Sequence, residues 1–297
     1  MRKSLLLAAL IGGFLLPAAV MAEDAAPTAH SHPEEKGTAP ATAPAAEPAS
    51  PHTFSYNVGL YSQYIFRGLT QTARRPALQG GVDYSHSSGF YAGTWGSNIS
   101  WLQDSKNFDR SSLEWDIYGG FRNTFGETGI GYDIGLLNYV YPGTKTGRKG
   151  DGSGFGNDNA GFDDPYTLEL YAALSYKWMQ AKVSYGLTDI FGVKNSDGSY
   201  YAELNANYPI GDTGFTVNAH VGRQEYDGKV NSIGIDNKKL YSYTDWKLGL
   251  TKSWNNGVNV GGYWTDTNAK DAGYGNDYYQ VNNIGDSTFT AFVQKTF

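Results

Sequence analysis

The sequence predicts an all-β protein, a transmembrane antiparallel β-barrel of twelve strands. Three observations predict this fold. The 297 residues are poor in charged residues (18%) but rich in aromatic residues (15%) and glycine (38 residues), while the mean hydropathy is −0.45. From Phe54 onward, apolar and polar residues alternate with the period of two that is typical of strands. The connections alternate between short turns and long loops, as they do in outer-membrane barrels.

The first 22 residues have the three parts of a secretory signal peptide. Arg2 and Lys3 form the positive region, Leu5–Leu16 is the apolar core, and Val20-Met21-Ala22 fits a cleavage site. We therefore expect an exported protein, located in the outer membrane of a Gram-negative bacterium.

Residues 23–52 are rich in Ala, Pro, Thr and Glu. Such a segment cannot bury an apolar core, so we expect a disordered linker. We interpret His30 and His32 within it as solvated residues, because two ligands hold a metal only loosely. Residues 53–297 remain for the barrel.

Alternation defines the barrel strands one by one. On the first strand the even positions hold Phe54, Tyr56, Val58, Leu60, Tyr64 and Phe66. We expect eleven further strands at about 76–86, 90–101, 112–123, 129–141, 165–178, 180–190, 199–208, 214–226, 243–254, 258–266 and 287–297. The third strand is expected to place Tyr91, Trp95, Ile99 and Trp101 on the lipid face.

Tryptophan positions predict two interfacial girdles, because indole rings favour the membrane–water interface. All seven tryptophans lie on the apolar parity of their strands. Trp101, Trp115, Trp246 and Trp264 fall near the long-loop ends, Trp178 and Trp254 near the short-turn ends, and Trp95 nearer mid-strand.

Composition excludes several classes of function. The absence of cysteine excludes a disulfide scaffold, a thiolate zinc site and a cysteine nucleophile. The net charge of −6 argues against a nucleic-acid partner. Beyond the N-terminus there is no apolar run of about 18 residues or more, which argues against a bundle of membrane helices.

Several motifs resemble those of a known family. They are YIFRGLTQT (64–72), PALQGG (76–81), SGFYAGTWGSN (88–98), EWDIYGG (114–120), YDIG (132–135) and YPG (141–143). Together they resemble the TorF-type putative porins. The resemblance implies an outer-membrane barrel and a presumed channel, and it supplies no catalytic or ligand residues.

The polar parity supplies the candidate pore-lining residues. These are Arg67, Asp83, Glu114, Asp116, Arg122, Asp133, Glu169, Lys182, Glu203, His220, Asp245 and Lys247, with Lys177 as a further base. A charged, water-filled lining selects ions or polar solutes. Alternatively, these groups pair across strands and plug the lumen, and Arg122 with Asp133 is one such expected pair.

Three further features have both a functional and a purely structural interpretation. His220 serves as a base only with a serine partner that the sequence does not identify, so a structural role is favoured. The glycine-rich acidic loop at 150–164 lacks the spacing of an EF-hand, which favours a solvated loop over a calcium site. The long-loop bases pair with anionic lipopolysaccharide or are ordinary loop charges; they are Arg74, Arg75, Lys145, Arg148 and Lys149.

The sequence thus predicts a non-enzymatic, porin-like channel for passive diffusion of small hydrophilic solutes or ions, weakly cation-selective. No cofactor and no metal are expected, and the partners are outer-membrane lipid, lipopolysaccharide and the solutes. The alternatives are an outer-membrane lipid hydrolase or acyltransferase, and a plugged structural or adhesive barrel.

Overall fold

A computed structural model describes residues 50–105, 111–143, 164–230, 234–276 and 281–297 of the chain. The predicted signal peptide and nearly all of the predicted linker lie outside these residues. So do Lys145, Arg148, Lys149 and most of the acidic loop at 150–164.

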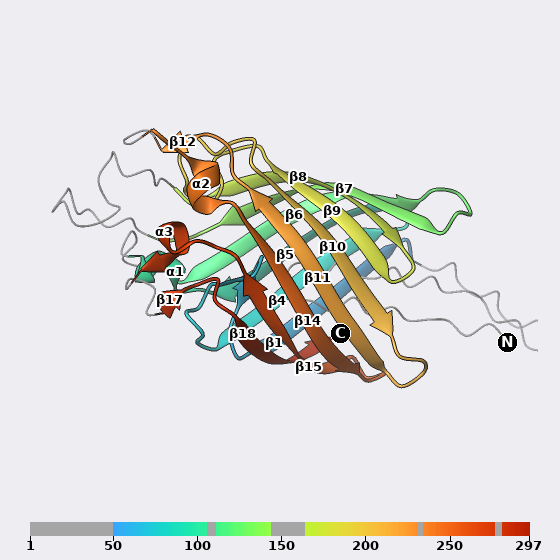
Figure 1. Ribbon diagram of the computed structural model, residues 1–297. Coiled ribbons are helices and arrows are strands. Elements are labelled where there is room, and N and C mark those ends of the chain that lie inside the picture. Colours follow the sequence, from blue (N-terminus) through green and yellow to red (C-terminus); the bar gives the residue numbers. More distant parts are fainter. Residues whose placement is uncertain (1–49, 106–110, 144–163, 231–233, 277–280) are drawn as a thin grey trace, which may run out of the picture.

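Twelve strands form a closed antiparallel barrel, as the sequence predicts. Each strand pairs with its neighbour along the chain, and the first and last strands pair to close the ring (Figure 1). The strands are β1 (His52–Tyr61), β4 (Ala77–His86), β5 (Phe90–Asn98), β6 (Leu113–Thr124), β7 (Ile130–Val140), β8 (Thr167–Tyr176), β9 (Met179–Gly186), β10 (Tyr200–Pro209), β11 (Phe215–Glu225), β14 (Tyr243–Ser253), β15 (Val258–Thr267) and β18 (Thr288–Thr296).

The two rims of the barrel differ in their connections. One rim has short turns, such as the two residues Lys177 and Trp178 between β8 and β9. Lys177 is exposed and has a φ of 55° in this turn, so it does not lie on the lumen wall as predicted. The other rim has the long connections, and β1 begins and β18 ends on the short-turn side (Figure 1).

On most strands, the residues of the apolar parity lie on the outward face of the barrel. Large side chains such as Phe54, Leu204 and Leu248 are more than half exposed on it, at 57%, 54% and 55%. Five of the seven tryptophans are exposed on this face, near the two rims that the sequence predicts. They are Trp115, Trp246 and Trp264 on one side, and Trp178 and Trp254 on the other.

Strand β5 has the opposite parity to the one predicted. Tyr91 is buried, and the Trp95 ring lies 5.5 Å from the ring of Tyr64 inside the barrel. Thr94 takes the outward position, where the exposed Trp115 indole donates a hydrogen bond to its hydroxyl. The inner face of β5 is aromatic because it packs against chain that enters the lumen. Apolar alternation alone therefore predicts the wrong face of β5 to be the lipid-facing one.

Small elements fill the connections on the long-loop side. They are β2 (Ile65–Phe66), β3 (Leu69–Thr70), α1 (Trp101–Asp104), β12 (Lys229–Val230), β13 (Ile235–Asp236), α2 (Asn237–Tyr241), α3 (Asp271–Tyr274), β16 (Gly275–Asn276) and β17 (Val281–Asn283). None of the helices in the described part of the chain is long and apolar enough to cross a membrane.

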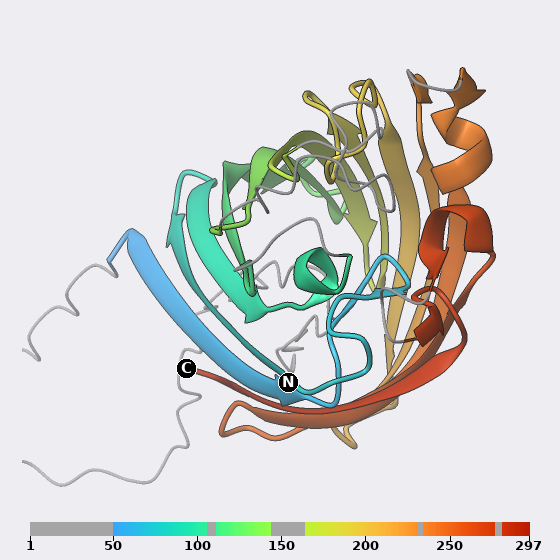
Figure 2. The same ribbon diagram turned by 90° about the vertical axis from the view of Figure 1, so that its left-hand side faces the viewer.

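These elements take two positions relative to the barrel. Figure 2 shows α1 and the connection that carries β2 and β3 inside the ring of strands, whereas α2 and α3 lie along the rim beside β14 and β15. A buried aromatic core inside the barrel contains Tyr64, Phe66, Tyr139 and Tyr171. A second core, with Tyr226, Tyr241, Tyr243 and Tyr274, lies at the long-loop mouth.

Candidate functional site: the lumen and its inserted hairpin

The connection between β1 and β4 folds into the barrel as a small hairpin. Its strands β2 and β3 pair with each other through Phe66 and Leu69, which leaves Arg67 and Gly68 as a two-residue turn. Both turn residues have positive φ, 45° and 79°. Such a turn twists in the same sense as the flanking strands, which is why tight hairpins favour it. We call residues 62–76 the inserted hairpin.

Arg67 joins the tip of the inserted hairpin to the far side of the lumen. Its guanidinium donates to Glu169 Oε2 on β8 at 2.7 Å and to Gln224 Oε1 on β11 at 2.8 Å. The guanidinium carbon also lies 4.4 Å from the ring centre of Tyr201 on β10. Because β8, β10 and β11 lie across the ring from β1 and β4, the hairpin spans the lumen.

Gly68 fits a space that has no room for a side chain. A Cβ atom at this position would lie 2.5 Å from Thr267 Cγ2 and 2.6 Å from Asp245 Cβ. The turn therefore touches β14 and β15 as well, and only glycine suits both the positive φ and the close approach.

Two further loops hold the inserted hairpin in place. Arg75, at the end of the hairpin, pairs with Asp104 of α1 at 2.7 Å. The backbone N–H of Trp101 donates to the carbonyl of Gln71 at 3.2 Å. From the connection between β9 and β10, the Phe191 ring packs edge-on against Phe66, with ring centres 5.4 Å apart. The long-loop mouth is thus packed with side chains from three connections.

Four residues that the sequence predicts to face lipid lie inside the barrel instead. Tyr64, Phe66 and Ile99 are buried, with 3%, 8% and 3% exposure, and Trp101 packs against Tyr141 in the aromatic core. The first barrel strand ends at Tyr61, and β5 ends at Asn98, so all four residues belong to connections that turn inward. Trp101 is therefore not part of a girdle.

Carboxylates lie directly behind the inserted hairpin. Glu114 on β6 accepts a hydrogen bond of 2.5 Å from the hydroxyl of Tyr64. Asp116, two residues further along β6, is fully buried, and neither of its oxygens has a hydrogen-bond partner among the described residues. A buried carboxylate without a partner is costly, so Asp116 is a destabilising group in the packed interior behind the hairpin.

A second polar cluster lines the wall formed by β10, β11 and β14. His220 Nε2 lies 2.9 Å from Asp245 Oδ1 and 2.9 Å from the Tyr201 hydroxyl, while Nδ1 lies 2.7 Å from Asn205 Oδ1. Glu203 is near, with its carboxylate 3.5 Å from His220 Nδ1. These contacts engage both ring nitrogens of His220, and the structural role favoured from the sequence stays a prediction.

A third cluster lies nearer the short-turn rim. The Tyr91 hydroxyl donates to Asp133 at 2.6 Å, and the Tyr118 hydroxyl donates to Asp83 at 2.6 Å. Lys182 faces the ring of Tyr171 at 4.6 Å. Tyrosine hydroxyls therefore hold the acids on this part of the wall.

The two remaining predicted residues are Arg122 and Lys247. Arg122 and Asp133 are register partners on β6 and β7, as the expected pair requires. Among the described contacts they form no ion pair, and Arg122 donates to the Ser85 hydroxyl at 2.6 Å. Lys247 is buried on β14 and lies 5.2 Å from the centre of the Tyr263 ring.

Sequence reasoning missed the residues that organise these clusters. Tyr64, Tyr139, Tyr201 and Gln224 contact the predicted charged groups, yet none is itself charged. Two of them, Tyr139 and Tyr201, have the same strand parity as the predicted pore-lining acids. This parity is the sequence signal that indicates an inward position for both. No group of three or more His, Asp or Glu side chains in the described chain is arranged to hold a metal ion.

A closed twelve-stranded barrel with an apolar outer face and a charged inner face is the architecture of outer-membrane barrel proteins. Within that class, the chain belongs to the family described as "Bacterial protein of unknown function (Gcw_chp)", which matches residues 45–297. The narrower TorF-type assignment stays a prediction.

The fold is similar to those of several solved barrels. The KdgM porin is 7% identical, with 82% of this chain and 99% of that chain covered and a TM-score of 0.46. An outer membrane channel from Pseudomonas putida F1 is 14% identical, with 86% and 100% covered and a TM-score of 0.44. LpxR from Salmonella typhimurium is 11% identical, with 82% and 99% covered and a TM-score of 0.38. No curated protein sequence matches the chain.

Proposed function

We propose that this protein is an outer-membrane channel of a Gram-negative bacterium that passes small hydrophilic solutes or ions by diffusion. One observation carries the proposal. The strands form a complete ring with a polar inner wall, and a hairpin held by side-chain contacts spans the lumen of that ring. Among the described strands β2 pairs with β3 alone, so the hairpin adds no strand to the wall. It constricts the lumen, and its displacement leaves the barrel ladder intact.

The two faces of the barrel support this location. Strands that face lipid must close on themselves, because an unpaired backbone group costs several kcal/mol there. The outward apolar side chains and the two sets of tryptophans fit that environment. Lipid and lipopolysaccharide then surround the barrel. Of the predicted lipopolysaccharide contacts, Arg74 is exposed, whereas Arg75 is engaged by Asp104.

The inner charges favour cations. Seven of the predicted lumen residues are acids and four are bases, since Lys177 belongs to a turn. The acids are Asp83, Glu114, Asp116, Asp133, Glu169, Glu203 and Asp245, and the bases are Arg67, Arg122, Lys182 and Lys247. Carboxylates on the wall of a narrow polar bore attract cations.

Single-channel recording of the purified protein in a planar bilayer tests the proposal. We expect small conductance steps and a reversal potential of cation-selective sign under a salt gradient. An absence of conductance, both in the wild type and after the hairpin is destabilised, would favour a structural or adhesive barrel.

The enzymatic alternative has one observation in its favour. His220 and Asp245 form a hydrogen-bonded pair, as in acyl-transfer sites. However, no serine is among the hydrogen-bond partners of His220 in the described part of the chain, so the cluster as described has no nucleophile of the kind that a hydrolase needs. Release of fatty acid from lipopolysaccharide by the wild type, lost in His220→Ala, would support the alternative.

A further inference from the structure

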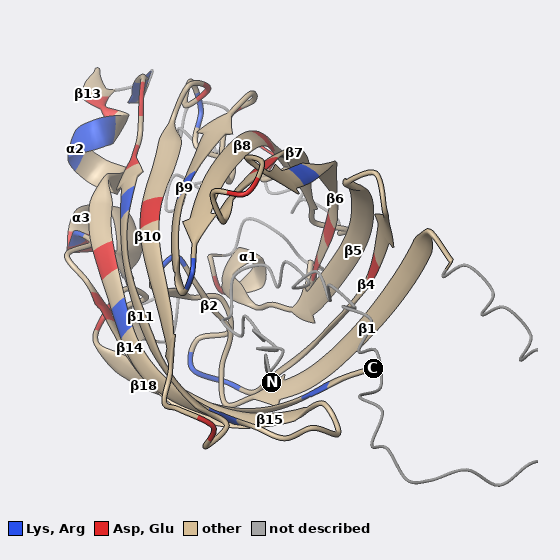
Figure 3. Ribbon diagram, turned by 90° about the vertical axis from the view of Figure 1, so that its right-hand side faces the viewer, with Lys and Arg blue, Asp and Glu red and all other residues tan. Residues whose placement is uncertain are grey.

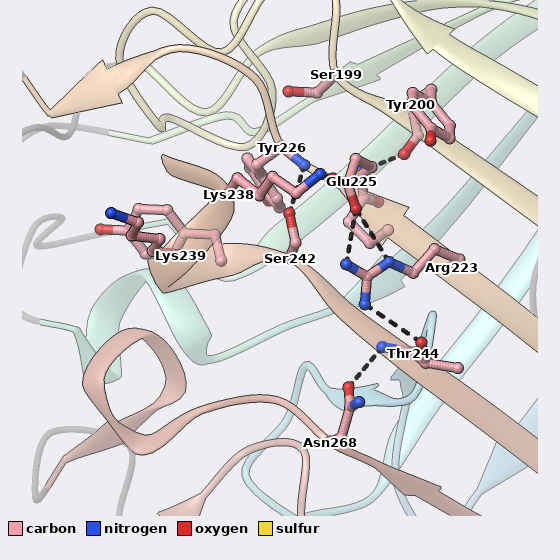
Figure 4. Close-up of polar contacts among 12 residues, drawn as sticks. Ser199, Tyr200, Arg223, Glu225, Tyr226, Lys238, Lys239, Ser242, Thr244 and Asn268 are labelled. Carbon is pink, nitrogen blue, oxygen red and sulfur yellow. Dashed lines mark hydrogen bonds and ion pairs between the residues drawn. The ribbon is translucent and has the colours of Figure 1, made fainter. Parts of the chain in front are cut away.

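A basic pocket lies on the outward side of the barrel at the long-loop rim. It has a volume of about 540 Å³. Its lining includes Arg223, Lys229, Lys238, Lys239, Asn268 and Lys270. Figure 4 shows how Arg223 of β11, Lys238 of α2 and Thr244 of β14 converge there. This pocket has no part in the lumen described above.

The position of the pocket follows from strand parity. Val221 and Trp246 are register partners on β11 and β14, and both are exposed on the outward face. The next outward pair toward the long-loop rim is Arg223 with Thr244. Two residues of strand span about 7 Å, so the Arg223 guanidinium stands just beyond the level of an interfacial tryptophan. Lipid phosphates lie at that level.

The pocket carries an excess of positive charge. Five of its lining residues are basic and two are acidic. One further carboxylate, that of Glu225, binds two cations at once: Arg223 Nη2 at 2.7 Å through one oxygen, and Lys238 through the other. This contact raises the pKa of the Lys238 ammonium, which therefore stays charged. Figure 3 shows the basic stretch of α2 outside the ring of strands.

Several donors in the pocket remain available to a ligand. The side chains of Lys229, Lys238 and Lys239 are 68%, 67% and 72% exposed. Lys229 and Lys239 approach Asp236 only at 3.8 and 3.6 Å. The side chain of Asn268 is oriented by its oxygen, which accepts from the backbone N–H of Thr244 at 2.7 Å. In the described structure its Nδ2 group has no acceptor.

We propose that this pocket binds a phosphate group of an anionic lipid headgroup in the outer leaflet. Arginine and lysine at one concave site provide charge-assisted hydrogen bonds to phosphate oxygens. A lipid is favoured over free phosphate because the outward apolar surface below the pocket, with Val221, Trp246 and Leu248, offers a place for acyl chains. The inference rests on the outer-membrane location proposed above and goes beyond the channel function.

Native mass spectrometry of the full chain in a neutral detergent tests the proposal. The probe is lipid A with both phosphates, compared with the same lipid after enzymatic removal of the phosphates. The test variants are Lys238→Gln with Lys239→Gln, and separately Arg223→Gln. The matched control is Lys177→Gln with Lys252→Gln, which removes two charges at the short-turn rim. Heat-modifiable migration on gels verifies that each variant retains the barrel.

The wild type and the control are expected to retain the phosphorylated lipid, and both test variants to bind it roughly tenfold or more weakly. The dephosphorylated lipid should bind the wild type with a similar loss. Equal binding by the test variants, or equal binding of the two lipids, would overturn the proposal. Displacement of the lipid by equimolar inorganic phosphate would show a site for free phosphate instead. Because bilayer conductance is measured separately, failure here is distinguishable from failure of the channel proposal.

Discussion

Arg67 Nη2 lies 2.7 Å from Glu169 Oε2, although the two residues are 102 positions apart in the chain and come from opposite sides of the barrel. Their side chains are only 7% and 2% exposed. This ion pair, together with the hydrogen bond from Arg67 to Gln224, fixes the inserted hairpin to the far wall. Its loss removes the main electrostatic link across the lumen.

Replacing Arg67 with Ala should displace the hairpin and raise channel conductance. Removing one partner of a buried ion pair destabilises by about 3 kcal/mol or more, because the other charge is left unpaired. Such a change shifts the ratio of displaced to inserted hairpin about a hundredfold. Planar-bilayer recording should show larger or longer openings. Arg74→Gln, at an exposed residue of the same hairpin, should behave like the wild type. Identical conductance of both variants would mean that the hairpin does not limit flow.

Gly68→Ala should have a similar effect by a steric route. A Cβ atom there would lie 2.5 Å from Thr267 Cγ2, and the φ of 79° adds roughly 1–2 kcal/mol of backbone strain. Gly126→Ala is the control, because Gly126 also has positive φ but no neighbouring atom within 4 Å. We expect limited proteolysis to cut the hairpin of the Gly68 variant faster than that of the control. Equal cleavage rates would show that the turn is not tightly packed.

The lipid-facing assignment predicts a difference between two arginine substitutions. Leu248 is 55% exposed on the outward face, whereas Ser175 lies on the inward parity of β8. Leu248→Arg should lower the free energy of unfolding by about 2–4 kcal/mol, and Ser175→Arg by much less. Urea unfolding in lipid vesicles measures both. A larger cost at Ser175 would mean that the assignment of faces is inverted.

The topology of the barrel predicts which rim faces the cell exterior. Asn282 lies on the long-loop side and Asn256 in a short turn between β14 and β15. Asn282→Cys should react with a membrane-impermeant thiol reagent on intact cells, and Asn256→Cys should react only after lysis. The chain has no native cysteine, so the introduced residue is the one thiol of this protein that can be labelled. The reverse pattern would overturn the orientation.

The strands of the barrel wall are predictable from the sequence, and the connections that pack inside the long-loop end are not. Parity correctly predicts that Leu248 and Asp245 lie on opposite faces, since strand parity is a local property. It wrongly predicts that Tyr64, Phe66 and Trp95 face lipid, because these residues continue an apolar alternation. Alternation reports only that one side of a strand is apolar, and an inserted hairpin makes the inner side apolar as well. The pairing of Arg67 with Glu169 depends on how far a loop reaches across the ring, which no local pattern encodes.

Selectivity should depend on whether the inserted hairpin is in place. With the hairpin inserted, Glu114 and Asp116 are buried behind it, at 1% and 0% exposure, so they cannot contact passing ions. The Glu203 side chain is more exposed, at 17%, on the wall near His220. In the wild type, Glu203→Gln should therefore move the reversal potential toward zero, and Glu114→Gln with Asp116→Asn should have little effect.

In the Arg67→Ala background, the double replacement should also reduce cation selectivity, because displacement of the hairpin exposes both carboxylates to the lumen. The effect should grow at low salt, where screening between the wall and the ion is weak. Glu127→Gln with Asp212→Asn, at two exposed residues of short turns outside the lumen, removes the same number of charges and should leave the reversal potential unchanged. If the double replacement shifted the reversal potential equally in both backgrounds, Glu114 and Asp116 would line the open path in the wild type, and the hairpin would not cover them.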